Sequence, residues 1–429
     1  MNYLSVNHPT GEIKENTHLA ISGSKSESNR VLVLRALLKG NPLAVYGSSN
    51  SEDTQLMEEA LESTEKTIDI HHAGTAMRFL SAYFAIQEGR ETILTGSSRM
   101  KERPIGILVD ALKQLGADIE YMEKEGFPPL KIIGKKLTNN KVTLSANVSS
   151  QYISALMLIG ITFENGLTIQ LDGNITSLPY LNMTIEMLKD FDIEVEWKGN
   201  TIYIKNRDLK NLQKRKGLIL SKNVYIESDW SSASYMYSIV ALAKQGDLQL
   251  RTFYNNSLQG DKELVNIYEK YFNVGTYFFE SQLVGEPPQI KLFRFKRHIA
   301  QRIELDLNNC PDIAQTIMVT AVGLKIPYIQ LTGLHTLKIK ETDRLFGMQQ
   351  ELLKVGAITE INEDSITLIR YQELPQVATI KTYNDHRMAM SFAPLALKGI
   401  KLSIENPDVV NKSYPNFWKN LEQLNFDLS

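Results

Sequence analysis

The sequence predicts an α/β protein of two domains, assembled from repeated helix-and-hairpin units. Its 429 residues exceed what one ordinary domain holds, so two domains are expected. An amphipathic helix followed by two short strands recurs four times along the chain. The copies recur about every 75 to 85 residues, a period that is typical of repeated supersecondary units rather than of one continuous sheet.

The four clearest copies share one pattern of signals. Alternation of apolar and polar residues identifies the strands, and we expect a glycine after each apolar helix to mark its end. The copies are 110–122 with 130–133, 187–197 with 202–204, 264–279 with 290–293, and 352–361 with 366–369. A helix expected at 53–61 and another at 417–424 suggest about six units, three in each domain. An unrelated series of helices and hairpins is the alternative.

The composition is that of a globular protein with packed cores. Hydrophobic residues make up 43% and charged residues 22%, and the formal net charge of −2 does not suggest a nucleic-acid partner. The segment 207–222 carries six basic residues, which we interpret as a solvated excursion rather than a polyanion site.

The chain has one cysteine, Cys310, so no disulfide within it is possible and a reducing compartment fits. No apolar run approaches the roughly 20 residues that span a bilayer, and the N-terminus does not have the pattern of a signal peptide. We therefore expect a cytoplasmic protein.

Small or basic polar residues stand directly before an apolar helix in five places. The five segments are 24–30, 74–78, 149–151, 340–344 and 384–387. A helix N-terminus has unpaired backbone N–H groups and a partial positive charge, and Lys or Arg adds full charge and further donors. One such segment is ordinary helix capping, but five that converge predict a site for multiply charged anions. A basic loop at 98–104 and Lys412 add to this positive charge.

Two carboxylates among these cations are candidates for proton transfer. Glu341 lies beside Lys340 and three residues before Arg344, and Asp312 stands at the head of the apolar helix expected at 313–322. Nearby cations are expected to keep both carboxylates ionised. The alternative for Asp312 is a helix N-cap. Cys310 is more consistent with a small buried hydrophobe than with a nucleophile, because it has no evident His partner.

Other chemistries lack their motifs. The sequence contains none of the phosphate-loop, dinucleotide-binding or nucleophile-elbow patterns. His71 and His72 are adjacent, so their side chains are expected to point apart in a strand, and no spaced His/Cys set suggests a structural zinc. We expect neither a metal nor a cofactor.

Several of these segments together resemble the 5-enolpyruvylshikimate-3-phosphate synthase family. The matching blocks occur in the family's order from residue 23 to 412, and include Lys-Glu-Thr-Asp-Arg-Leu from Lys340 and Asn-Asp-His-Arg-Met-Ala-Met from Asn384. The resemblance implies a two-domain inside-out α/β barrel in which each domain has three βαβαββ units. One domain would comprise 1–22 with 227–429, the other 23–226, and the active site would lie in the cleft between them.

The resemblance also implies a reaction: the enolpyruvyl group of phosphoenolpyruvate is transferred to the 5-hydroxyl of shikimate 3-phosphate, and phosphate is released. Asp312 would take the hydroxyl proton, and Glu341 would act on the methylene carbon with help from Lys25. The expected partners are these two small molecules, without nucleic acid or membrane, and the chain is expected to be a monomer.

The residues implied to bind each substrate follow from the motif match. Shikimate 3-phosphate would be bound by Lys25, Ser26, Arg30, Ser149, Ser150, Gln151, Ser177, Tyr180, Asp312, Thr336 and Lys340. Phosphoenolpyruvate would be bound by Lys25, Gly74, Arg103, Gln151, Arg344, His386, Arg387 and Lys412.

Four positions depart from the commoner family pattern: His72, Phe79, Leu178 and Thr336. The last two weaken the shikimate-side assignment, whereas the retained Gly74 implies inhibition by glyphosate. A related transferase acting on UDP-N-acetylglucosamine is a rival, but the cysteine it usually carries is missing from 97–103. A non-catalytic anion-binding protein on the same scaffold is a second rival, and the paired carboxylates argue against it.

Overall fold

The computed structural model describes residues 2–38, 43–147, 149–173, 175–206, 222–279, 287–295, 299–373 and 375–429. The chain divides into two compact units, which we call the N-terminal unit (Ser24–Ile226) and the C-terminal unit (Met1–Gly23 with Glu227–Ser429). The predicted basic excursion at 207–222 lies outside the described residues apart from its last residue. No helix in the described ranges is long and apolar enough to cross a membrane.

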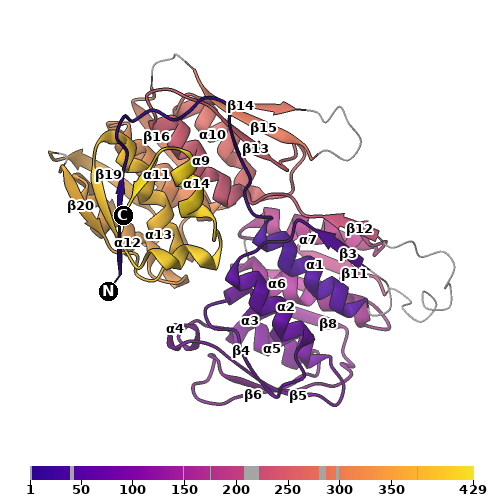
Figure 1. Cartoon of the computed structure of the whole chain (residues 1–429). Coiled ribbons are helices and arrows are strands. Elements are labelled where there is room, and N and C mark those ends of the chain that lie inside the picture. Colours follow the sequence, from indigo (N-terminus) through magenta and orange to yellow (C-terminus); the bar gives the residue numbers. More distant parts are fainter. Residues whose placement is uncertain are drawn as a thin grey trace. The chain divides into compact units, whose positions relative to one another are not determined.

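The same small sheet recurs in the N-terminal unit (Figure 1). Two parallel strands are followed by an antiparallel hairpin, and the second hairpin strand pairs with the second parallel strand. One copy has β4 (Thr67–Asp69), α3 (Gly74–Ala85), β5 (Glu91–Thr95), α5 (Gly106–Gln114), β6 (Asp118–Tyr121) and β7 (Leu130–Ile133). Another has β8 (Lys141–Ser145), α6 (Ser150–Ile159), β9 (Leu167–Asp172), α7 (Leu178–Asp190), β10 (Val195–Lys198) and β11 (Thr201–Ile204). The third sheet pairs β3 (Leu43–Tyr46) with β12 (Lys222–Tyr225), and α1 (Lys25–Leu37) and α2 (Glu52–Glu62) flank β3 in sequence.

The C-terminal unit contains three sheets of this kind. One copy has β2 (Thr17–Leu19), α9 (Trp230–Leu242), β13 (Leu248–Arg251), α10 (Leu264–Tyr271), β14 (Val274–Phe279) and β15 (Gln289–Arg294). A second has β16 (Arg302–Asp306), α11 (Ala314–Gly323), β17 (Tyr328–Thr332), α12 (Arg344–Lys354), β18 (Ala357–Ile361) and β19 (Ile366–Tyr371). The third has β20 (Val377–Ile380), α13 (His386–Phe392), β21 (Lys401–Glu405), α14 (Phe417–Gln423), β22 (Asp427–Leu428) and β1 (Tyr3–Asn7).

The first strand of the chain completes the last repeat. Strand β1 pairs antiparallel with both β21 and β22, so it occupies the place that the second hairpin strand takes in the other copies. The six sheets in the described part of the chain confirm the predicted α/β class and its repeated units.

The helix ends repeat as closely as the sheets do. After α5, α7, α10, α12 and α14 the second residue past the helix has a positive φ. These left-handed residues are Gly116, Asp192, Asn273, Gly356 and Asn425. The prediction of a glycine after each helix was therefore wrong for the copies with Asp192 and Asn273. Asp and Asn reach this conformation more readily than other side chains, so they can substitute for glycine there.

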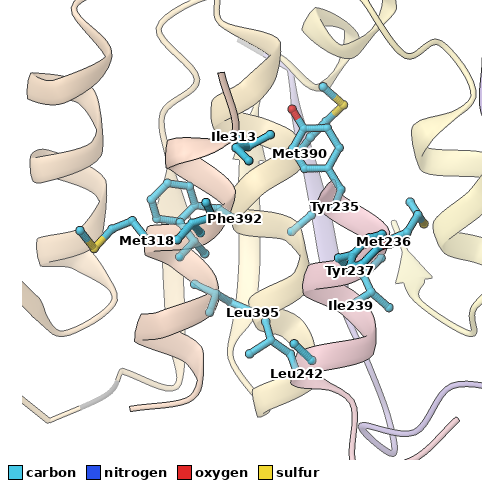
Figure 2. Close-up of a cluster of buried hydrophobic side chains, with 14 of the residues drawn as sticks. Tyr235, Met236, Tyr237, Ile239, Leu242, Ile313, Met318, Met390, Phe392 and Leu395 are labelled. Atoms are coloured by element: carbon cyan, nitrogen blue, oxygen red, sulfur yellow. The ribbon is translucent and has the colours of Figure 1, made fainter. Parts of the chain in front are cut away.

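Each unit packs its sheets around helices that are buried on every side. In α3, α11 and α13 every residue is buried, as are all of α9 except Ser231 and all of α6 except Gln151. A helix that is hydrophobic all round belongs in a core rather than at a surface. Figure 2 shows this core in the C-terminal unit, where Tyr235 and Leu242 of α9, Met318 of α11 and Phe392 of α13 are among the clustered side chains. The N-terminal unit has its own core around α1, α3 and α6.

Candidate active site

All five segments that were predicted to precede a helix contain its first residue, although 74–78 lies wholly within α3 and 24–30 lies within α1 apart from Ser24. Helices α1, α3, α6, α12 and α13 begin at Lys25, Gly74, Ser150, Arg344 and His386. Four of these helices have a side-chain cap, since Ser24, Ser149, Asp343 and Asp385 each accept a hydrogen bond from a backbone N–H of the first turn. Four of the five are helices whose bodies lie in a core, so their polar first turns stand where the core ends. The first turns of these helices thus bring the predicted polar residues together within each unit.

The basic segment at 98–104 differs from the expectation of a loop. Residues Ser98–Lys101 form a short helix, α4, and Ser97 caps it by accepting a hydrogen bond from the Met100 N–H. His71 and His72 also differ, because they lie in a turn after β4, where His71 has a positive φ of 44°. A left-handed turn residue cannot continue a strand, so the expected alternation of their side chains does not apply.

Arg344 connects three carboxylates in the C-terminal unit. Its Nε lies 2.7 Å from Asp385 Oδ2, its Nη1 lies 3.0 Å from Asp312, and its Nη2 lies 2.9 Å from Glu341. The Arg344 side chain is 2% exposed and that of Asp385 is fully buried. The first residue of α12 therefore holds the N-cap of α13 and both predicted proton-transfer carboxylates.

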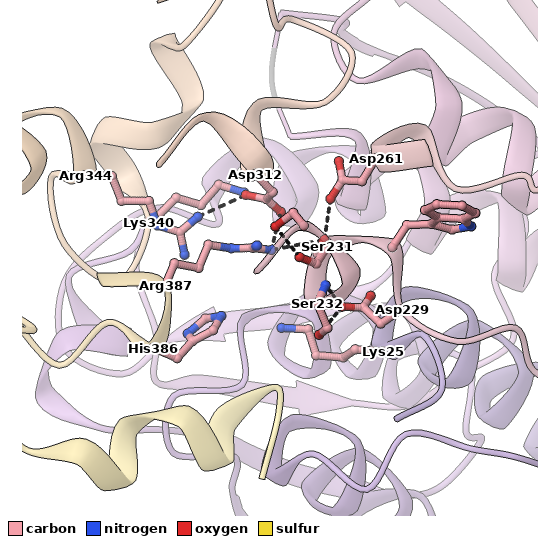
Figure 3. A network of polar contacts seen from close by, with 12 residues as sticks. Lys25, Asp229, Ser231, Ser232, Asp261, Asp312, Lys340, Arg344, His386 and Arg387 are labelled. Atoms are coloured by element: carbon pink, nitrogen blue, oxygen red, sulfur yellow. Dashed lines mark hydrogen bonds and ion pairs between the residues drawn. The ribbon is translucent and has the colours of Figure 1, made fainter. Parts of the chain in front are cut away.

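Each of these two carboxylates also has a cation of its own. Asp312 lies 3.5 Å from Lys340 Nζ and 3.2 Å from Arg387 Nη2. Glu341 lies 2.9 Å from the Nζ of Lys412, which is the last residue of a short 3-10 helix at Pro407–Lys412. Figure 3 shows the side chains of Lys340, Arg344 and Arg387 directed at the Asp312 carboxylate. Residues that are far apart in sequence are thus gathered into one network of alternating charge.

The charges of this network reinforce one another. Burial by itself would raise the pKa of Asp312, but Arg387, Lys340 and Arg344 outweigh it and hold that pKa well below its usual range. Burial by itself would lower the pKa of Arg344 and of Arg387, and the surrounding carboxylates raise both instead. Asp312 is therefore held as an ionised carboxylate at neutral pH, as the sequence predicted.

A further part of the network was not predicted from sequence. Arg387 also donates to the Tyr235 hydroxyl at 3.5 Å and to Ser231 Oγ at 3.4 Å, and Ser231 donates in turn to Asp261. Burial and the charge of Asp312 raise the pKa of Asp261 to about 7. No local pattern in the sequence indicates which hydroxyl meets which arginine.

Two predicted residues of the C-terminal unit lie beside this network. His386 is buried and its Nδ1 lies 3.6 Å from Asp385. Thr336 is half-buried on a short 3-10 helix at His335–Ile339, just before Lys340.

In the N-terminal unit Arg30 is as deeply buried as Arg344, but it has different neighbours. Its Nε donates to Thr184 Oγ1 at 2.8 Å and its Nη2 to Ser154 Oγ at 3.0 Å. The backbone carbonyls of Ser26 and Tyr180 accept further bonds, at 2.8 and 3.4 Å. Phe79 and Tyr180 place their rings against the guanidinium. Burial lowers the pKa of Arg30 to about 10, so it stays charged at neutral pH.

Gly74 allows two guanidinium groups to approach the start of α3. A Cβ at this position would lie 2.6 Å from Arg103 Nη1 and 2.9 Å from Arg78 Nη1. Arg78 donates to the Gly74 carbonyl at 2.8 Å, and Gln151 Nε2 donates to Thr75 Oγ1, on the adjacent residue of α3, at 3.0 Å. The absence of a side chain at Gly74 is what gives both arginines their room.

The remaining predicted residues of this unit lie at helix starts. Lys25 pairs with Asp53 at 2.9 Å, a partner on α2 that sequence reasoning did not identify. Ser149 caps α6, and Ser150 is its first residue. Ser177 is the left-handed N-cap of α7, and its carbonyl accepts a bond from the Tyr180 N–H.

Cys310 is buried next to the Asp312 helix start. Burial and nearby carboxylates raise the pKa of its thiol, so the neutral form dominates at physiological pH. This agrees with the interpretation of Cys310 as a small buried hydrophobe. Within the described ranges no group of three or more His, Cys, Asp or Glu side chains is arranged to hold a metal ion.

Solved structures share this architecture over the whole chain. An EPSP synthase from Acinetobacter baumannii superimposes with a TM-score of 0.75, and each chain covers 100% of the other at 21% identity. The enolpyruvyl transferase NikO from Streptomyces tendae gives a TM-score of 0.71 at 13% identity, covering 100% of this chain and 98% of that one. At these identities the likeness establishes the fold alone. An EPSP synthase and an enolpyruvyl transferase both have this fold.

Sequence comparison identifies the family. Residues 60–421 match the model of EPSP synthase (3-phosphoshikimate 1-carboxyvinyltransferase). The chain is 42% identical over 414 residues to a 3-phosphoshikimate 1-carboxyvinyltransferase of Bacteroides fragilis, with 96% of this chain and 95% of the relative covered. A relative of the same name from Colwellia psychrerythraea is 35% identical over 99% of this chain and its own full length. The chain therefore belongs to the EPSP synthase family.

Proposed function

We propose that the protein transfers the enolpyruvyl group of phosphoenolpyruvate to the 5-hydroxyl of shikimate 3-phosphate and releases phosphate. Family membership and full-length relatives that are 35–42% identical support this reaction. The acceptor rests on these relatives rather than on the fold, because one fold can serve several acceptors.

The reaction needs two proton-handling groups. The 5-oxygen bonds to C2 of phosphoenolpyruvate as it loses its proton, and C3 gains a proton. Loss of a proton from C3 and cleavage of the bond from C2 to the phosphate oxygen then restore the double bond. We assign the hydroxyl proton to Asp312 and the C3 proton to Glu341, with Lys25 assisting. The observation that carries this proposal is that Arg344 binds both carboxylates, at 3.0 and 2.9 Å, while each keeps a lysine of its own.

Binding of the two anions is assigned to residues of both units. Shikimate 3-phosphate is assigned to Lys25, Ser26, Arg30, Ser149, Ser150, Gln151, Ser177, Tyr180, Thr336 and Lys340, with Asp312. Phosphoenolpyruvate is assigned to Gly74, Arg103, Arg344, His386, Arg387 and Lys412, with Lys25 and Gln151. Arginine forks suit carboxylate and phosphate oxygens, and helix N-termini add oriented N–H donors. Holding two anions that repel each other supplies both positioning and charge stabilisation.

Phosphate release by the purified protein tests the reaction. We expect release only when phosphoenolpyruvate and shikimate 3-phosphate are both present, and none when either is omitted. Release with UDP-N-acetylglucosamine but not with shikimate 3-phosphate would contradict the acceptor while leaving the transfer class intact.

The Glu341→Ala variant separates an enzyme from a non-catalytic anion-binding protein. Removing this carboxylate leaves Lys412 and Arg344 to bind anions, so substrate affinity should persist while turnover is lost. Ligand affinity is measured by calorimetry and turnover by phosphate release. A variant that keeps its turnover would remove Glu341 from the mechanism.

A further inference from the structure

A buried carboxylate outside the proposed chemistry holds the turn that precedes α13. Glu351, near the end of α12, is fully buried. Its oxygens accept hydrogen bonds from the Tyr383 hydroxyl at 2.7 Å and from the Lys381 backbone N–H at 2.9 Å. Lys354 Nζ lies 2.6 and 2.8 Å from the same two oxygens. A buried charge needs such partners, and two of them come from the segment that leads into α13.

This segment makes a turn that its sequence does not favour. Tyr383 and Asn384 have φ values of 53° and 55°, and the Asp385 N–H donates to the Thr382 carbonyl at 2.8 Å. Two positive φ values at the centre of a closed turn are typical of type I′. Asn adopts this conformation readily, whereas it is a genuine outlier for a bulky residue such as Tyr. Tertiary contacts must therefore hold Tyr383 in place.

One face of α12 supplies these contacts. Arg344, Gly347 and Glu351 lie on the same side of the helix, because their spacing of three and then four residues matches the helical turn. A Cβ on Gly347 would lie 3.6 Å from the Tyr383 ring, so the ring lies flush against the helix there. Arg344 binds Asp385 at the first turn and Glu351 binds the Tyr383 hydroxyl two turns later.

We propose that Glu351 is a positioning residue, which fixes the 382–385 turn through Tyr383 and thereby aligns Arg344 and Arg387 for the anionic substrate. The link is Asp385, which receives Arg344 Nε at 2.7 Å on one oxygen and the Arg387 backbone N–H at 2.9 Å on the other. A turn that relaxes moves Asp385, and both arginines move with it. The functional consequence rests on the proposed function, in which both guanidinium groups bind phosphoenolpyruvate.

Steady-state kinetics test this consequence with two variants. Glu351→Gln places an amide N–H₂ against a donor, and Tyr383→Phe removes one hydroxyl and leaves the ring on Gly347. We expect the KM for phosphoenolpyruvate to rise about tenfold in Glu351→Gln and about threefold in Tyr383→Phe. The KM for shikimate 3-phosphate should stay within about twofold of the wild-type value. Leu353→Ala, an exposed position on the same helix, is the matched control and should leave both constants unchanged.

A merely structural role would lower the melting temperature and the active fraction without changing either KM, and that result would overturn the proposal. Tyr383→Phe carries the test if Glu351→Gln does not fold. It keeps the buried carboxylate and its lysine, so it preserves most of the network.

Amide hydrogen exchange tests the clamp without depending on activity. In Glu351→Gln the N–H groups of Asp385 and Arg387 should exchange faster than in the wild type, because both are bonded within the turn. Unchanged exchange would overturn the clamp itself. A wild-type protein without phosphate release would instead contradict the proposed function, so the two failures are distinguishable.

Discussion

The two units hold their buried arginines in different ways. In the C-terminal unit Arg344 and Arg387 are paired with carboxylates, above all Asp385 and Asp312. In the N-terminal unit Arg30 donates instead to uncharged acceptors, namely two hydroxyls and two backbone carbonyls. The pKa follows the same division, since carboxylates raise that of Arg344 whereas burial lowers that of Arg30 to about 10.

The difference indicates two uses for the same residue type. A buried guanidinium whose hydrogen bonds go to neutral acceptors keeps a charge that a ligand anion can compensate, which suits binding. A guanidinium that is already paired with carboxylates holds those carboxylates ionised and in place. We therefore expect substitutions of Arg30 and of Asp312 to change different kinetic constants.

The largest effect is expected for Asp312→Asn. The amide cannot accept the hydroxyl proton as a carboxylate does, so kcat should fall by about 10² to 10⁴. The KM for phosphoenolpyruvate should not rise, because the variant removes a negative charge beside Arg387 and Arg344. Steady-state kinetics check both constants, and Asp306→Asn, an exposed aspartate at the end of β16, is the control. A variant with normal kcat would place proton transfer elsewhere.

Arg30→Lys should act on binding instead. Lysine keeps the charge but loses the fork that reaches Thr184 and Ser154 together, so the KM for shikimate 3-phosphate should rise about tenfold or more. The change in kcat should be smaller than the change in KM. Arg90→Lys, in the same unit and also packed against an aromatic ring, provides the matched control. A large fall in kcat at unchanged KM would erase the distinction between the two units.

Gly74→Ala tests the close approach in the N-terminal unit. The added Cβ would lie 2.6 Å from Arg103 Nη1, so the guanidinium must shift. A displaced charge at the start of α3 should raise the KM for phosphoenolpyruvate by roughly tenfold. The melting temperature should change little, because the atom that yields is the end of a flexible side chain. An unchanged KM would show that Arg103 does not need this position.

The smallest effect concerns the pH dependence of stability through Asp261. Burial and the charge of Asp312 raise its pKa to about 7 in the folded protein, above the value of an unfolded aspartate. The folded state therefore binds the proton more tightly, and this contribution to the free energy of unfolding is lost as pH rises towards 7. Asp261→Asn should remove that part of the decline between about pH 4 and pH 7 in urea titrations. Parallel pH profiles of variant and wild type would contradict the shifted pKa.

Local signals explain why so much of the site was found from sequence. The starts of α1, α3, α6, α12 and α13 were predicted correctly because capping residues and small polar residues act within one turn of the helix. The left-handed helix ends were predicted only where glycine occupies them. Asp192 and Asn273 take the same conformation without that signal. Local rules thus identified where a helix begins or ends more reliably than which residue takes the left-handed conformation at its end.

The partners of the charged groups could not be predicted in this way. Arg344 meets Asp385 across 41 residues, and Glu351 meets Tyr383 across 32. Both pairings depend on how α12 packs against the segment that leads into α13, and no periodicity encodes that packing. The turn containing His71 shows the same limit at short range, because a single positive φ ended the expected strand.

The sequence by itself determined the α/β class, the repeated unit and the helix starts at which the polar residues stand. These depend on hydrophobic period and capping chemistry, which act over a few residues. Only the tertiary structure decided which buried arginine is paired with carboxylates and which donates its hydrogen bonds to neutral acceptors. That choice sets the pKa of each group, and it depends on which residues of separate elements the packed inner helices bring within hydrogen-bonding distance.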